Sequence, residues 1–170
     1  MQNQKSNITL KKHSGMFTLT SEQFLPLPLE EAWVFFSSPA NLEKLTPNNM
    51  GFEVTQLPEG AAYPGMIISY KIRLMPGVKV NWVTEITNVK DQQYFTDEQR
   101  FGPYAMWHHE HHFKAVKGGV EMVDRVGYKL PLGALGRFFH FLIKPALVHI
   151  FDYRYKMLVQ HFPHKTSNPN

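Results

Sequence analysis

The feature that most constrains the fold is a change in hydrophobic period along the chain. Between Gly51 and Pro131 apolar residues alternate with polar ones, which is the period of a half-buried β-strand. Turn-forming residues divide this region into segments, and short connections between strands favour antiparallel hairpins. The predicted strands cover residues 52–56, 66–75, 80–88, 93–101, 104–116 and 120–130.

Helical patterns flank the alternating region. Residues 17–25 predict one more strand, and two short helices are expected after it, opened by Pro28 and Pro39. After Gly136 an apolar stripe that includes Arg154 recurs at helical spacing. Because an interior proline loses a backbone hydrogen bond, we expect this long helix to be kinked at Pro145, or a second helix to begin there.

These elements predict an α+β fold. An antiparallel sheet needs an apolar cover on one face, and only the terminal helix is long enough to supply it. We therefore expect a seven-stranded curved antiparallel sheet around a long C-terminal helix, with two short helices after the first strand. Residues 15–163 are predicted to form a single domain, and the polar, aperiodic residues 1–14 and 164–170 to be disordered tails.

Composition excludes several classes of function. The 170 residues contain no Cys, which rules out disulfides, a Cys nucleophile and thiolate metal sites. The formal net charge of +4 comes from scattered cations rather than a basic stripe, so no nucleic-acid partner is expected. No stretch resembles a signal peptide or has the length of a membrane span, and a cytoplasmic location is expected.

Strand parity predicts a pocket between the sheet and the terminal helix. Alternate residues of a strand share one face, and the face with the bulkiest aromatic residues is expected to point inward. The inward set is mostly aromatic, with a few polar groups concentrated on three adjacent strands, as in a small-molecule pocket. The expected ligand-binding residues are Tyr70, Trp82, Asp97, Gln99, Trp107, His109, His111, Phe113 and Asp124.

Three interpretations of the polar residues are open. His109, His111 and Asp124 are residue types that bind zinc or non-haem iron. The same groups can form a hydrogen-bonded wall that holds the polar end of a ligand, and this interpretation is favoured, with no metal and no cofactor expected. A histidine of the pair could also act as a general acid or base, oriented by Asp124 or Asp97, although no nucleophile motif is present and no catalytic residue is assigned.

Three segments resemble a known superfamily. They are Asn-Leu-Glu-Lys-Leu-Thr-Pro at 41–47, Gly-Pro-Tyr-Ala-Met-Trp-His-His-Glu-His-His-Phe at 102–113, and Asp-Arg-Val-Gly-Tyr-Lys-Leu-Pro-Leu-Gly at 124–133. Together with the order of elements they are similar to the START/polyketide-cyclase superfamily (SRPBCC), over residues 16–162. The resemblance implies the helix-grip fold, shared with birch-pollen-allergen-like proteins. It is strongest to a bacterial subgroup labelled cyclase or cell-division-inhibitor-like without an assigned reaction.

The resemblance and the predicted pocket point to one function and leave alternatives. The favoured function is binding of a hydrophobic or amphipathic small molecule, lipid- or polyketide-like, between sheet and helix. The alternatives are a cofactor-free cyclase, dehydratase or hydrolase using a cavity histidine, and an interaction module with a closed core. The apolar segment 138–143 is expected to be buried in the core. The alternatives are transient contact with a membrane and a dimer seam. No stable membrane insertion is expected, and the chain is expected to be a monomer or a homodimer.

Overall fold

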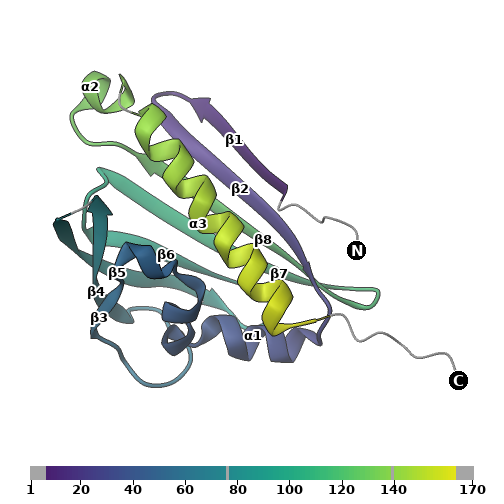
Figure 1. The fold of residues 1–170 in the computed structure, drawn as a ribbon. Coiled ribbons are helices and arrows are strands. Elements are labelled where there is room, and N and C mark those ends of the chain that lie inside the picture. The colour runs from purple at the N-terminus through teal and green to yellow at the C-terminus, as the bar shows by residue number, and fades with distance from the viewer. Residues whose placement is uncertain (1–6, 76, 139, 164–170) are drawn as a thin grey trace, which may run out of the picture.

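Eight antiparallel strands form one curved sheet around a long C-terminal helix (Figure 1). The computed structural model describes residues 7–75, 77–138 and 140–163. The strand order is β1-β2-β8-β7-β6-β5-β4-β3, so the N-terminal hairpin lies beside the last strand in sequence. The strands are β1 (Asn7–His13), β2 (Met16–Leu25), β3 (Glu53–Gln56), β4 (Ile67–Met75), β5 (Val78–Lys90), β6 (Tyr94–Phe101), β7 (Met106–Val116) and β8 (Gly119–Lys129).

The additional strand is β1, which corrects the prediction of seven strands and places residues 7–13 of the predicted tail 1–14 in the sheet. It pairs with β2 through a turn at Ser14 and Gly15, both with positive φ (47° and 79°), as in the two-residue turns that suit hairpin twist. Ile8 and Leu10 pack against the core, while the other β1 side chains are exposed. This polar outer face is why the segment resembles a tail in sequence. The rest of the predicted tails, residues 1–6 and 164–170, lies outside the described residues.

The helices differ from the predictions in two places. α1 spans Leu29–Ser37 as expected, but the second short helix is replaced by single 3₁₀ turns, with N–H groups bonded to the carbonyl three residues earlier. These turns span Pro39–Asn41, Glu43–Leu45 and Asn48–Met50. α2 spans Gly133–Phe138 and α3 spans His140–His161. Pro145 lies inside α3, so no second helix begins there.

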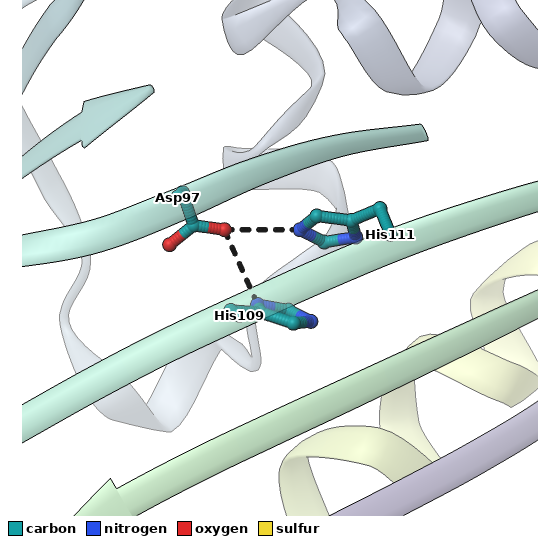
Figure 2. Close-up of side chains that lie close together, drawn as sticks. All are labelled: Asp97, His109 and His111. Atoms are coloured by element: carbon teal, nitrogen blue, oxygen red, sulfur yellow. Dashed lines mark hydrogen bonds and ion pairs between the residues drawn. The ribbon is translucent and has the colours of Figure 1, made fainter. Parts of the chain in front are cut away.

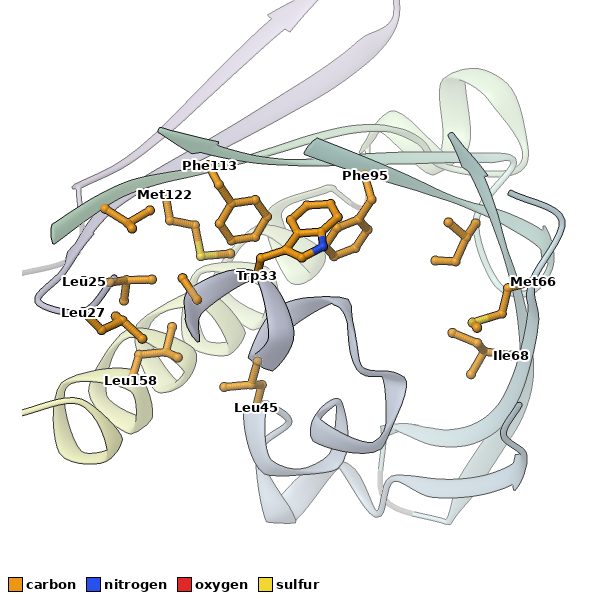
Figure 3. Packing of buried hydrophobic residues seen from close by; sticks show 13 residues of the cluster. Leu25, Leu27, Trp33, Leu45, Met66, Ile68, Phe95, Phe113, Met122 and Leu158 are labelled. Atoms are coloured by element: carbon orange, nitrogen blue, oxygen red, sulfur yellow. The ribbon is translucent and has the colours of Figure 1, made fainter. Parts of the chain in front are cut away.

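Two apolar clusters hold the helices against the sheet. Trp33 of α1 packs edge to face against Phe95 of β6 and Phe113 of β7, at centroid distances of 6.0 and 5.7 Å (Figure 3). The second cluster lies under α3, where Leu147 and Phe151 are buried with residues of β2 and β8. The two clusters anchor different parts of the sheet, and the candidate site lies between them.

The apolar segment at the start of α3 is only partly buried. Ile143 packs against the second cluster, whereas Phe138, Phe141 and Leu142 are exposed. Of the helices in the described ranges, none is long and apolar enough to cross a membrane.

The closeness of β2 and β8 predicts different effects for two glycines of β8. A Cβ at Gly119 would lie 2.1 Å from the backbone oxygen of Leu25, whereas the nearest atom to a Cβ at Gly127 is 3.9 Å away. We expect Gly119→Ala to lower the free energy of unfolding by about 2–3 kcal/mol, because overpacking against backbone forces the strands apart. Gly127→Ala should cost less than about 0.5 kcal/mol. Equal losses in urea denaturation of the two variants would contradict this account.

Candidate functional site

A cavity with mostly apolar walls lies between the sheet, α3 and the segment that carries the 3₁₀ turns. Its volume is about 170 Å³, and it is partly open to solvent. Apolar side chains come from both layers because the sheet curves away from α3 between the two core clusters. They include Ile68 and Ile72 of β4, Phe95 of β6, and Leu147, Ile150 and Phe151 of α3.

Six of the predicted site residues line this cavity and three do not. The six are Tyr70, Trp82, Asp97, Trp107, His109 and His111. Gln99 is instead bonded to the backbone of Tyr104, donating through Nε2 (2.7 Å) and accepting at Oε1 (3.2 Å), and so ties the β6–β7 connection. Phe113 packs against Trp33 in the core cluster under α1. Asp124 lies behind the histidines rather than on the cavity wall.

Asp97 and the two histidines converge on one wall of the cavity (Figure 2). The strand register places Asp97 opposite His109, and β7 projects His109 and His111 to the same side. The Oδ2 atom of Asp97 lies 3.3 Å from His109 Nδ1 and 3.0 Å from His111 Nε2. All three side chains are largely buried, with exposed fractions of 15%, 6% and 9% respectively.

Asp124 closes the cluster from the opposite side. The register of β7 and β8 sets it across from His111. Its Oδ1 atom lies 3.1 Å from His109 Nε2 and 2.7 Å from His111 Nδ1, although the second contact lacks the direction of a hydrogen bond. The Nη1 atom of Arg154 lies 3.4 Å from the same oxygen. The two carboxylates thus alternate with the two imidazole rings, and α3 adds a cation.

Arg154 is the functional candidate that the sequence prediction did not assign. It lines the cavity and contacts Asp124, and its Nε atom is buried without a hydrogen bond among the described residues. The available signal was a lone cation on an otherwise apolar helical stripe. Such a residue faces the core, where a charge needs a partner of opposite sign.

The contacts within the cluster set its charges. Burial alone would raise the pKa of Asp97, but His109 and His111 outweigh it and hold that pKa below its usual range. Burial likewise opposes ionisation of Asp124, while Arg154 and the histidines lower its pKa well below 3.8. For His109 burial lowers the pKa, and the two carboxylates reverse that effect and raise it above 6.5. The cluster therefore combines ionised carboxylates with cationic partners.

The aromatic wall adds neutral donors. Burial raises the pKa of the Tyr70 hydroxyl far above 10, so the phenol stays protonated, and its oxygen lies 3.3 Å from Thr84 Oγ1. The indole Nε1 of Trp82 is buried without a hydrogen-bond partner among the described residues. Tyr70 stacks on Trp82 with a centroid distance of 5.9 Å, and Trp107 meets the same indole edge to face at 5.2 Å. The wall is thus a continuous aromatic surface with few polar groups.

Comparison with known proteins supports the fold. No protein-family model matches the sequence, and no curated protein matches it. Among solved structures, protein Ms6760 from Mycobacterium smegmatis has a TM-score of 0.68 at 17% identity, covering 96% of this chain and 99% of that one. Protein TTHA0849 from Thermus thermophilus has a TM-score of 0.61 at 18% identity, with 88% and 99% covered. Ara h 8.0201 has a TM-score of 0.56 at 18% identity, with 86% and 99% covered.

These likenesses show the fold class. The eight-stranded antiparallel sheet with its long C-terminal helix matches the helix-grip fold of birch-pollen-allergen-like proteins, which confirms the predicted architecture. At identities of 17–18% the likeness extends to the fold and not to a reaction or a ligand.

The buried position of Asp124 predicts a large effect of its removal. Asp124→Ala leaves the histidines and Arg154 without their shared carboxylate, and we expect a loss of about 3–5 kcal/mol in the free energy of unfolding. Glu110→Ala is the matched control. Glu110 contacts His112 and Arg125 on the outer face of the same sheet, and its removal should cost at most about 1 kcal/mol. Similar losses in both variants would show that burial does not distinguish the two clusters.

The shifted pKa values predict a pH window for this stabilisation. The raised pKa of His109 gives a contribution that is complete below pH 6.5 and is lost as the pH rises through the folded-state value. The lowered pKa values of Asp97 and Asp124 give contributions complete above 3.8 and lost as the pH falls. In a buffer with a chelator, urea denaturation should show the free energy of unfolding declining above pH 6.5. His109→Gln should remove that decline and His112→Gln should keep it, and the reverse pattern would contradict the assignment.

Proposed function

We propose that this protein binds a hydrophobic or amphipathic small molecule in the cavity between the sheet and α3. The observation that carries the proposal is a cavity with apolar and aromatic walls and one cluster of polar groups. Its volume of about 170 Å³ slightly exceeds that of an engineered apolar cavity of about 150 Å³ that holds benzene. A group the size of a substituted ring, or a short stretch of acyl chain, fits without rearrangement.

The composition of the cavity walls favours one orientation of the ligand. Trp82, Trp107 and Tyr70 offer flat aromatic surface to its apolar part. Arg154 stands at the polar wall, and its buried Nε–H, which has no hydrogen bond among the described residues, suits an oxygen acceptor on the ligand. The resemblance of the sequence to the START/polyketide-cyclase superfamily is compatible with a ligand of this kind. An amphipathic ligand with an oxygen-bearing end is therefore favoured over a pure hydrocarbon.

A cofactor-free enzyme is less well supported by the geometry. A general acid or base needs a ring nitrogen that can reach the substrate. Both nitrogens of His109, and both nitrogens of His111, lie within 3.3 Å of a carboxylate oxygen of the cluster. Neither ring therefore presents a free nitrogen to a ligand in this arrangement. Acid–base catalysis would first require one carboxylate to withdraw.

A single substitution at the cavity wall tests the proposed function. Ala62 lines the cavity, and Ala62→Phe places a ring in the space that a ligand would occupy. Ala115, exposed on β7, accepts the same change without touching the cavity. We expect Ala62→Phe to weaken binding of the fluorescent probe 1-anilinonaphthalene-8-sulfonate at least about tenfold, the effect of about 1.4 kcal/mol, and Ala115→Phe to leave it unchanged.

Native mass spectrometry of the purified protein gives the second readout of the same variants. An organic mass that is present in the native spectrum and lost on denaturation should accompany the parent chain and Ala115→Phe, and be reduced in Ala62→Phe. Probe binding that is equal in all three proteins, with no bound organic mass in any of them, would overturn the proposal and favour a closed core.

A further inference from the structure

The contacts around the two histidines contain a conflict of hydrogen-bonding roles. Each of the four ring nitrogens lies 2.7–3.3 Å from a carboxylate oxygen. A neutral imidazole has one N–H and one acceptor nitrogen, and an ionised carboxylate only accepts. With both rings neutral, two of the four contacts would place acceptor against acceptor. One divalent cation held by the two rings and Asp97 would relieve this conflict.

The spacing on the Asp97 side is that of a metal coordination sphere. Asp97, His109 and His111 each offer one ligand atom, and the three atoms lie within 4.8 Å of one another. Ligand atoms at about 2.0 Å from a tetrahedral metal are about 3.3 Å apart. The distances from Asp97 Oδ2 to the two ring nitrogens, 3.3 and 3.0 Å, are already close to that value (Figure 2). A cation can enter with small side-chain movements.

Asp124 occupies the position of an outer partner to such a site. Metal-binding histidines direct their second nitrogen to a carboxylate, which fixes the tautomer and the ring orientation. Here one carboxylate oxygen of Asp124 faces His109 Nε2 at 3.1 Å and His111 Nδ1 at 2.7 Å. Arg154 contacts the same oxygen from α3. The contact with His109 is a hydrogen bond, whereas the contact with His111 lacks the direction of one. Asp124 therefore orients His109 and leaves its Nδ1 atom to face the Asp97 side.

We propose that Asp97, His109 and His111 bind one divalent transition-metal cation, with Asp124 and Arg154 as positioning residues. Two imidazole nitrogens and one carboxylate oxygen suit Zn²⁺ and its neighbours in the first transition row. The three ligands stand on the cavity wall, so a further coordination position faces the cavity. The ligand set differs from the one considered for the sequence, because the carboxylate that faces the cavity is Asp97 rather than Asp124. The inference does not depend on the proposed organic ligand.

Metal titration of the chelator-stripped full-length protein tests the proposal. We expect isothermal titration calorimetry to show one equivalent of Zn²⁺ and visible spectroscopy to show one equivalent of Co²⁺. Asp124→Asn should lower the Zn²⁺ affinity about 10–100-fold, as loss of an outer partner does. His109→Gln and Asp97→Asn should lower it further. The matched control is His108→Gln, on the outer face of the same strand, where the affinity should not change.

A measurement on the parent protein guards against variants that fail to fold. One equivalent of Cu²⁺ should give an electron paramagnetic resonance spectrum with coupling to two imidazole nitrogens, and Zn²⁺ should abolish it by competition. Three results would overturn the proposal. They are the absence of Zn²⁺ and Cu²⁺ binding, loss of the Zn²⁺ site in His108→Gln, and Cu²⁺ coordination by a single imidazole. Each of these results is independent of binding of the fluorescent probe, so failure of the metal proposal is distinguishable from failure of the proposed function.

Discussion

The register of three neighbouring strands determines the functional part of this protein. Pairing of β6 with β7 sets Asp97 opposite His109, and pairing of β7 with β8 sets His111 opposite Asp124. A shift of one residue would turn the histidines to the outer face, because side chains alternate along a strand. The apolar neighbours on the same face hold the register, since Phe113 and Val126 would be exposed by such a shift. Burial of the core thus positions the polar cluster.

Burying the charged groups of the cluster costs free energy, and contacts within the cluster offset that cost. Two buried carboxylates would be strongly unfavourable alone, and each contacts nitrogens of both imidazole rings. Arg154 reaches the cluster only because α3 crosses the open side of the curved sheet (Figure 1). The cavity and the charged cluster therefore depend on the same helix. A ligand and a cation would use neighbouring parts of one wall.

Much of the architecture could be predicted because it depends on local pattern. Alternation located the strands from Glu53 onward within a few residues, and parity placed Trp107, His109 and His111 on the inward face. The failures arose where pairing with a neighbouring strand or the path of a connection decides. β1 forms because β2 supplies its hydrogen-bond partners. Gln99 bonds to the backbone of Tyr104 in the β6–β7 connection, and the alternation of a strand does not predict the path of a connection.

The sequence by itself determined the antiparallel strands, the terminal helix and the face on which the histidines lie, since these follow from hydrophobic period. The tertiary structure decided which carboxylate faces the cavity and which stands behind the rings. Asp97 and Asp124 share the inward parity of their strands, and only the register and the curvature of the sheet distinguish them. The tertiary structure also decided the contact between Arg154 and Asp124. Arg154 lies on α3 and Asp124 on β8, and the hydrophobic period of one element gives no information on its contacts with another.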